Sequence, residues 1–354
     1  MLHQTKVYFF TTTIIQTQIT KIIRKIHIKI IFHNNMINNK SVMITGAAGF
    51  IGSHLTETLL SHNNFLVLID NFNDYYPGKD EQLQNILNNY QQNREYKLLK
   101  ADIVDNSTFN KINHELDYIF HLAAQAGVRY SIDNASEVTY NNIVGTVNVF
   151  EYASKLPSIK KVIYASSSSV YGDPLYTPVD ENHPKNPISP YAVSKLCGEN
   201  YANLYFKEYN LPVTSLRFYT VYGPRSRPDM AIKKFFSHIL GDKEIIIYGD
   251  GTQKRDFTYI SDIINGLILA GEVDKSSGEI FNIGSSNPIS VNDLVSRMYE
   301  IAKVEKKIKF IEHQKGDVYI THSDISKARK ILSFKPKTTI EVGLENQYEW
   351  QVSL

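Results

Sequence analysis

The sequence predicts an α/β protein in which a doubly wound parallel sheet is followed by a smaller α/β lobe. The first observation is that short apolar runs alternate with segments of helical spacing from residue 40 to about 216. Such alternation is typical of a parallel sheet covered by helices on both faces. The second is that this regularity ends near residue 217. The length of 354 residues, 42% of them hydrophobic, suits one large domain or two unequal lobes.

The elements follow in order along the chain. The predicted strands of the sheet are residues 42–45, 65–69, 96–99, 117–120, 161–165 and 213–218. The polar stretch 71–95 predicts a loop with a helix. The smaller lobe is expected to hold strands at 245–248, 280–283 and 308–311 and helices at 290–303 and 323–332. We therefore expect a first domain at 40–216 and a second lobe at 217–354, with some segments crossing between them.

The charge balance argues against a nucleic-acid-binding surface. The formal net charge is +2, but the first 35 residues hold five basic side chains and no acidic one, so the remainder carries 33 basic and 36 acidic side chains. No apolar run approaches 18 residues, so we expect no conventional membrane span. The single cysteine, Cys197, fits a reducing compartment, and we expect a cytoplasmic protein.

Residues 1–39 differ in composition from the rest, being rich in Ile, Thr and Asn. One interpretation is a targeting or interfacial helix, because several isoleucines share one helical face. The other is an upstream start codon, with Met36 lying just before the first strand. We favour the second and expect an extension that is disordered or lies outside the mature fold.

A glycine turn joins the first strand to the first helix. Gly46, Gly49 and Gly52 follow the strand at 42–45 with GxxGxxG spacing, and the second strand ends in Asp70. Gly46 allows the tight turn, Gly49 lets a diphosphate approach the helix N-terminus, and Gly52 allows close packing of helix and sheet. A carboxylate at Asp70 favours NAD over NADP, because a 2′-phosphate would meet a like charge. Glycines alone could form an ordinary turn, but the whole context predicts a Rossmann-type NAD site.

A second pattern is the pair Tyr191 and Lys195, which lie four residues apart at the start of a predicted helix and so share one face. A free tyrosine has a pKa near 10, and a nearby ammonium or oxidised nicotinamide favours the phenolate that a general base needs. YxxxK alone is common and also fits a packed Tyr beside a surface Lys. The serine run 166–169, at the carboxyl end of the strand at 161–165, places hydroxyls near the same point.

Taken together, residues 40–350 resemble the extended short-chain dehydrogenase/reductase family, and within it most closely the UDP-glucuronate 4-epimerases. Long stretches carry this resemblance: DNFNDYY at 70–76, HLAAQAGVRYS at 121–131, RFYTVYGP at 217–224, RPDMA at 227–231 and RDFTYI at 255–260. The resemblance implies an NAD-dependent isomerase that oxidises C4 of a UDP-sugar to a 4-keto intermediate, lets the ring rotate, and reduces it on the other face.

The resemblance also assigns site residues. Ser167, Tyr191 and Lys195 fall at the catalytic positions. Cofactor contacts are implied for Gly46, Gly49, Phe50, Ile51, Gly52, Asp70, Asn71, Asp102, Ile103, Leu122, Ala123, Ala124, Tyr191, Lys195 and Tyr219. Sugar-nucleotide contacts are implied for Arg129, Asn142, Ser168, Ser169, Thr220, Arg227 and Arg255. No metal is expected. A homodimer is implied, with helices around 141–154 and 190–206 pairing across a two-fold axis.

The loop after the catalytic serine separates neighbouring activities. The 4,6-dehydratases have an Asp–Glu pair where Ser168 and Ser169 stand, and the UDP-glucuronate decarboxylases have a Glu in this loop. Thr220 stands where UDP-galactose 4-epimerases usually have Asn, and a threonine suits a C6 carboxylate. We therefore expect conversion of UDP-glucuronate to UDP-galacturonate. An epimerase of UDP-glucose or UDP-N-acetylglucosamine, and a non-catalytic protein that binds NAD or a sugar-nucleotide, remain as alternatives.

Overall fold

The structure is a computed structural model that describes residues 37–312 and 318–354. The extension predicted at residues 1–39 therefore lies almost entirely outside the described residues. Ile37 is described, is buried and packs into the core beneath the sheet, where its carbonyl oxygen accepts a hydrogen bond from the Asn64 side chain. The compact fold thus begins at least three residues before the predicted boundary at residue 40.

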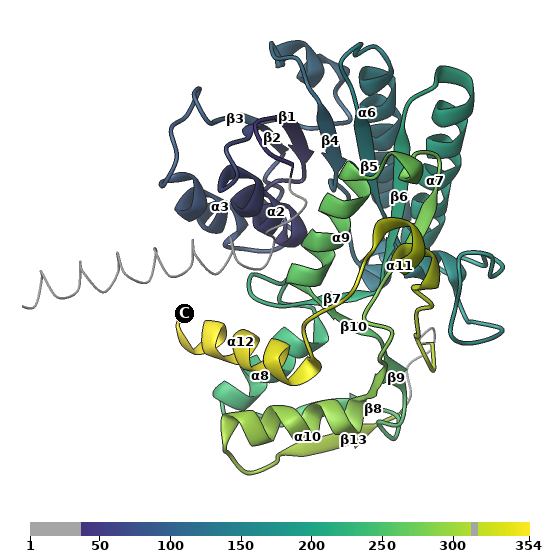
Figure 1. Cartoon of the computed structure of the whole chain (residues 1–354). Coiled ribbons are helices and arrows are strands. Elements are labelled where there is room, and N and C mark those ends of the chain that lie inside the picture. Colours follow the sequence, from purple (N-terminus) through teal and green to yellow (C-terminus); the bar gives the residue numbers. More distant parts are fainter. Residues whose placement is uncertain (1–36, 313–317) are drawn as a thin grey trace, which may run out of the picture.

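Within the described residues, a seven-stranded parallel sheet forms the larger part of the molecule (Figure 1). Its strands run in the order β11-β6-β5-β4-β1-β2-β3. Their bounds are β1 Ser41–Thr45, β2 Phe65–Asp70, β3 Tyr96–Lys100, β4 Tyr118–His121, β5 Lys161–Ser167, β6 Val213–Phe218 and β11 Ile280–Ile283. The order reverses between β1 and β4, and ligands of open α/β sheets bind at such a switch point, beyond the carboxyl ends of the strands.

Helices cover both faces of this sheet, as the alternation in the sequence predicts. One apolar core lies between the sheet and α2 (Phe50–Leu60), α3 (Lys79–Leu87), α9 (Ile260–Glu272) and α11 (Ser326–Leu332). A second core lies between the other face and α6 (Gly145–Ser154) and α7 (Pro190–Tyr209). The shorter helices α4 (Val128–Asp133) and α5 (Ala135–Thr139) lead through a π-helical turn, Tyr140–Val144, into α6.

The smaller lobe has its own apolar core. It contains the parallel pairs β8 (Ile245–Tyr248) with β13 (Ile308–Ile311) and β7 (Thr220–Tyr222) with β10 (Phe257–Tyr259), and the antiparallel pair β9 (Lys254–Arg255) with β12 (Ile289–Ser290). Its helices are α8 (Ala231–Leu240), α10 (Val291–Ala302) and α12 (Ile340–Val352). Short 3₁₀ turns occur at Asn106–Lys111, Ser168–Tyr171 and Asp274–Ser276.

One predicted strand belongs to a different sheet than expected. Residues 280–283 form a strand, but it pairs with β6 at the edge of the large sheet. Phe281 and Ile283 are fully buried there, in the core of the large sheet and not in that of the smaller lobe. The chain therefore returns to the large sheet after leaving it at β6.

Candidate active site

The glycine turn has the geometry that a dinucleotide requires. Gly46 has φ +72°, and a Cβ on it would lie 2.7 Å from the Ala123 backbone nitrogen. A Cβ on Gly52 would lie 2.0 Å from the Gly46 carbonyl oxygen, so only glycine lets α2 start this close to β1. Gly49 is the N-cap of α2 and has no side chain to satisfy the first N–H groups of the helix. Apart from the Phe50 N–H, which donates to the Tyr76 hydroxyl, these groups are therefore open to an anion such as a diphosphate.

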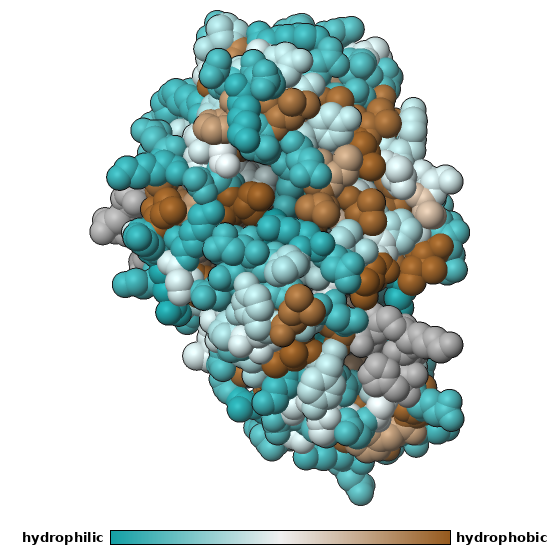
Figure 2. Space-filling view, turned by 90° about the vertical axis from the view of Figure 1, so that its right-hand side faces the viewer, coloured by the Kyte–Doolittle hydropathy of each residue, from teal (hydrophilic) through white to brown (hydrophobic). Residues whose placement is uncertain are grey.

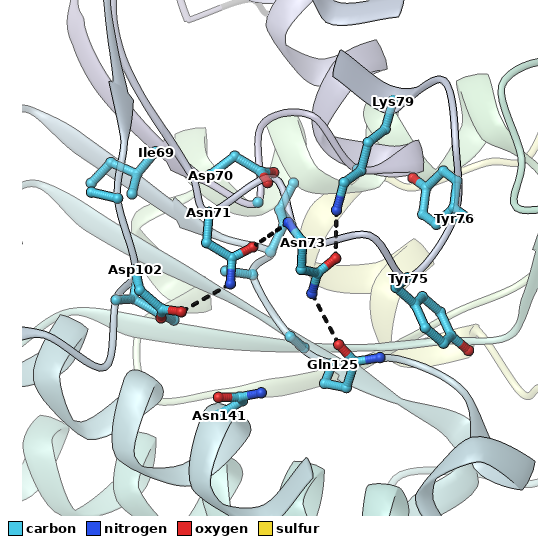
Figure 3. A pocket seen from close by; sticks show the side chains of 17 residues that line it. Ile69, Asp70, Asn71, Asn73, Tyr75, Tyr76, Lys79, Asp102, Gln125 and Asn141 are labelled. Atoms are coloured by element: carbon cyan, nitrogen blue, oxygen red, sulfur yellow. Dashed lines mark hydrogen bonds between the residues drawn. The ribbon is translucent and has the colours of Figure 1, made fainter. Parts of the chain in front are cut away.

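A cavity opens at the carboxyl ends of β1, β2 and β4, and Figure 3 shows it from close by. Many of the predicted cofactor residues line it, namely Gly46, Gly49, Asp70, Asn71, Asp102, Ile103, Leu122, Ala123 and Ala124. The structure therefore brings together residues that are up to 78 positions apart in the sequence. A nucleotide with its diphosphate at the glycine turn and its ribose at Asp70 fits the chemistry of this wall.

The carboxylate of Asp70 is held firmly at the end of β2. One of its oxygens accepts the Ala48 N–H at 2.9 Å and the other accepts the Phe72 N–H at 2.8 Å. Beside it, the Asn71 amide donates to Asp102 at 2.9 Å (Figure 3). The two acidic side chains thus lie along one side of the cavity, where ribose hydroxyls and an adenine amine could donate hydrogen bonds.

Ser167, Tyr191 and Lys195 meet where β5 ends and α7 begins. Ser189 caps α7 by accepting the Ala192 N–H, so the helix starts one residue before Tyr191. The Tyr191 hydroxyl hydrogen-bonds the Ser167 hydroxyl. The Lys195 ammonium donates to the Ala165 carbonyl oxygen at 2.8 Å and lies 5.8 Å from the centre of the Tyr191 ring. The three side chains predicted to be catalytic therefore form one cluster.

The electrostatics of this cluster differ from the sequence-based expectation. Burial raises the pKa of Tyr191, and the groups that oppose this rise are the Arg227 guanidinium and the Ser167 hydroxyl. Burial also lowers the pKa of Lys195 to about 7, against the attraction of Glu199. Arg227 is thus the cation that opposes the rise in the tyrosine pKa, whereas the YxxxK pattern led us to expect this role for the lysine.

A buried ion pair connects the elements that carry the cluster. Glu199, one helical turn after Lys195, accepts hydrogen bonds from the Arg217 guanidinium at 2.8 and 2.6 Å, and both side chains are at most 2% exposed. The Ser166 hydroxyl donates to the same carboxylate at 2.5 Å. Arg217 also donates to the Tyr171 hydroxyl at 2.7 Å. These bonds tie α7 to β5 and β6 directly behind the catalytic side chains.

Several residues of the predicted substrate site lie close to the cluster. Ser168 and Ser169 follow Ser167 in the 3₁₀ turn, and the Ser169 hydroxyl donates to Ser167 at 2.8 Å. Arg227 forms a two-bond ion pair with Asp229 and lies 5.9 Å from the centre of the Tyr75 ring. Of the remaining members, Thr220 is half-buried on β7. Arg129 is exposed and lies 5.5 Å from the centre of the Tyr248 ring, and Arg255 donates to the backbone carbonyls of Lys254 and Tyr319.

The structure buries the side chains of two predicted contact residues. Asn142 is buried, and its amide bonds both the backbone N–H and the carbonyl oxygen of Gln125 as well as the Ser194 hydroxyl. It therefore holds Gln125 in place, and its side chain is not free for a sugar. The Tyr219 side chain is buried among Val170, Tyr171 and Val179 and does not line the cavity, so a cofactor contact of this residue remains a prediction.

The remaining predicted residues act through the backbone or from a neighbouring position. The side chains of Phe50 and Ile51 pack in the core, and the Phe50 N–H donates to the Tyr76 hydroxyl, which leaves the Ile51 N–H for a ligand. The prediction missed Ile69, Asn73, Tyr75, Tyr76, Lys79, Ala101, Gln125 and Asn141, all of which line the cavity. Most of these lie in or next to the stretches 70–76 and 121–131, so membership of these motifs could have predicted that they line the cavity.

Comparison with known proteins agrees with the geometry. The family model for GDP-mannose 4,6 dehydratase matches residues 43–347. UDP-glucuronate 4-epimerase 4 of Arabidopsis thaliana is 38% identical over 335 residues, which cover 89% of this chain and 76% of that protein. The chain therefore belongs to the NAD-dependent epimerase/dehydratase family of extended short-chain dehydrogenases/reductases.

Solved structures show the same fold. UDP-glucuronic acid 4-epimerase from Bacillus cereus, solved with UDP-glucuronic acid and NAD, is 36% identical with a TM-score of 0.82 and covers 88% of this chain and 99% of its own. UDP-N-acetylglucosamine 4-epimerase from Methanobrevibacter ruminantium, solved with UDP-N-acetylmuramic acid, is 33% identical with a TM-score of 0.82 and covers 90% and 99%. In the part of the chain that the structure describes, no helix is long and apolar enough to cross a membrane.

Proposed function

We propose that this chain is an NAD-dependent nucleotide-sugar 4-epimerase that converts UDP-glucuronate to UDP-galacturonate. The observation that carries the proposal is the cluster of Ser167, Tyr191 and Lys195 beside the cavity of the glycine turn. The two sites are physically linked, because Asn142 bonds both Gln125, which lines the cavity, and Ser194 on α7. The relatives that share the fold include epimerases solved with NAD and a UDP-sugar.

The side chains have distinct roles in this reaction. Tyr191 takes the proton of the sugar C4 hydroxyl and, after the ring has rotated, returns a proton to the C4 oxygen. Ser167, already bonded to Tyr191, holds the C4 oxygen and shares its proton. Arg227 places positive charge near the phenolate, and the Lys195 ammonium, held by the Ala165 carbonyl, lies 5.8 Å from the centre of the tyrosine ring. Bound NAD would supply the hydride acceptor and donor for C4 and a positive ring that favours the phenolate.

The choice of a uronate rests on the side chains near the C6 position. Ser168, Ser169 and Thr220 offer hydroxyl groups, and Arg227 offers a guanidinium that can hold a carboxylate. The 4-keto-uronate is a β-keto acid, so the site must also keep its carboxylate out of the alignment that releases carbon dioxide. UDP-glucose has a hydroxyl at C6 and UDP-N-acetylglucosamine likewise, so neither alternative substrate needs a guanidinium at that position.

Product analysis tests the substrate. The protein is incubated separately with UDP-glucuronate, UDP-glucose and UDP-N-acetylglucosamine, and products are assigned by NMR. We expect inversion of C4 chiefly with UDP-glucuronate. Arg227→Ala and Thr220→Ala should weaken binding and release some UDP-pentose, whereas the exposed Arg329→Ala on α11 should behave like the unaltered protein. Preferred turnover of a hexose, with no pentose from either variant, would contradict the assignment.

The assembly is proposed to be a homodimer. Val193 and Leu204 lie eleven residues apart on α7, which is three helical turns, and both are exposed, as is Tyr140 just before α6. Figure 2 views the molecule from the side on which α7 lies and shows apolar side chains gathered there. Light scattering should report a dimer that Leu204→Asp dissociates, while Val304→Asp, at an exposed position in the smaller lobe, leaves it intact. A monomer at every concentration would refute this.

A further inference from the structure

Lys79 is a buried lysine that no role described so far explains. It is the first residue of α3, is only 7% exposed, and its side chain points into the cavity beside Asn73 (Figure 3). Its ammonium donates to the Asn73 side-chain oxygen at 2.5 Å. Among residues 37–312 and 318–354, no carboxylate lies within ion-pair distance of it. A buried cation whose hydrogen-bond partner is a neutral amide and which has no ion pair is costly, so this arrangement points to an anionic ligand.

Asp70, a carboxylate of the cavity wall that attracts Lys79, is fixed by backbone groups and forms no ion pair with the lysine. Asp70 uses one oxygen for the Ala48 N–H and the other for the Phe72 N–H, and both bonds are short. Burial lowers the pKa of Lys79 although the charges of Asp70, Asp74 and Asp80 oppose this. Asp70 therefore attracts the ammonium from a distance without pairing with it.

The segment that carries Lys79 reaches the N-terminus of α2. The backbone of Phe50, the first residue of that helix, hydrogen-bonds the hydroxyl of Tyr76, and the Lys79 ammonium lies 5.6 Å from the centre of the Tyr76 ring. Asn73 connects the lysine to Gln125 by a 3.1 Å bond, and the second polar atom of that buried amide, Gln125 Nε2, has no partner within the described residues. Lys79, Gln125 and Gly49, the N-cap of α2, thus line the same cavity.

We propose that the Lys79 ammonium binds the diphosphate of the dinucleotide, opposite the N-terminus of α2. On binding, it exchanges the neutral Asn73 oxygen for charged phosphate oxygens, and Gln125 Nε2 gains an acceptor. The GxxGxxG turn then supplies one side of the anion site and the 73–79 segment the other. The inference rests on the proposed use of NAD, but it does not depend on which sugar is epimerised.

The test separates the diphosphate from the rest of the nucleotide. Binding of ADP and of adenosine to the full-length protein, freed of nucleotide, is measured by calorimetry for the unaltered chain, Lys79→Met and Lys79→Gln. We expect both variants to bind ADP ten- to a hundredfold more weakly, as expected for loss of a hydrogen bond between charged groups, and adenosine within twofold of the unaltered protein. Circular dichroism confirms that the variants fold.

A matched control comes from the same sheet. Lys100, the last residue of β3, lies over the Phe72 ring at 5.7 Å and is exposed, so Lys100→Met removes the same charge close to the cavity. It should change ADP affinity less than threefold. Unchanged ADP affinity in the Lys79 variants, equal losses for ADP and adenosine, or an equal loss in Lys100→Met would overturn the inference. Because these are binding measurements, their outcome is independent of whether the protein epimerises a sugar.

Discussion

Removing Arg217 should show how strongly the buried ion pair holds the catalytic region together. In Arg217→Met the Glu199 carboxylate stays buried with the Ser166 hydroxyl as its remaining side-chain partner. Breaking such a pair from one side costs about 3–5 kcal/mol of unfolding free energy. A carboxylate can escape by taking up a proton, which at pH 7 costs about 3.7 kcal/mol for an ordinary glutamate and at pH 5 about 1 kcal/mol. The destabilisation should therefore be large at pH 7 and shrink at pH 5.

Urea unfolding at the two pH values measures this directly. The double variant Glu199→Leu/Arg217→Met should recover much of the loss at pH 7, because no charge is then left buried. The control is Lys155→Met, which breaks the exposed Lys155–Glu151 pair on α6 and should cost below about 0.5 kcal/mol. A loss below about 1 kcal/mol in Arg217→Met at pH 7, or an equal loss at both pH values, would refute the reasoning.

Three further predictions follow from the site. Tyr191→Phe should lower turnover by about 10²–10⁴-fold while leaving NAD binding unchanged, and normal turnover would contradict the proposed base. Gly52→Ala should weaken NADH binding by at least about tenfold, because the new Cβ would meet the Gly46 carbonyl oxygen at 2.0 Å. NADH fluorescence measures this affinity, and an unchanged value would argue against the close approach of α2 to the glycine turn. The pKa of Lys195 is about 7, below that of a free lysine, so the unfolded chain binds more protons between pH 7 and about 10.4. This lysine therefore makes the free energy of unfolding increase with pH across that window, by up to about 1.4 kcal/mol per pH unit. Urea titrations of Lys195→Met should show no such increase.

The sequence predicts the large sheet well because its signals are local. Each of the six strands expected from apolar runs between residues 42 and 218 is present, with bounds that differ by at most two residues. The glycine turn and Asp70 were recognisable because a tight turn and close packing require glycine, and the ribose hydroxyls require a carboxylate. The strand at 280–283 was also visible, but its partner was not, because pairing with β6 is a contact across more than sixty residues.

Parts of the site could not be derived from residue types alone. A motif position does not say whether a side chain is free, and Asn142 is fully engaged by Gln125 and Ser194. Nor does a lysine in a polar loop reveal that it will be buried without a carboxylate, as Lys79 is. The influence of Arg227 on Tyr191 likewise depends on the fold, which brings together two residues that are 36 positions apart in the sequence.

The central claim is that C4 of one bound sugar is oxidised and reduced again without release. The most direct measurement uses UDP-glucuronate carrying deuterium at C4, in ordinary water, with the UDP-galacturonate product examined by NMR and mass spectrometry. The account predicts that the product keeps its deuterium at C4 and that Tyr191→Phe forms little product. Loss of the deuterium to solvent, or inversion that proceeds equally well without the Tyr191 hydroxyl, would contradict it.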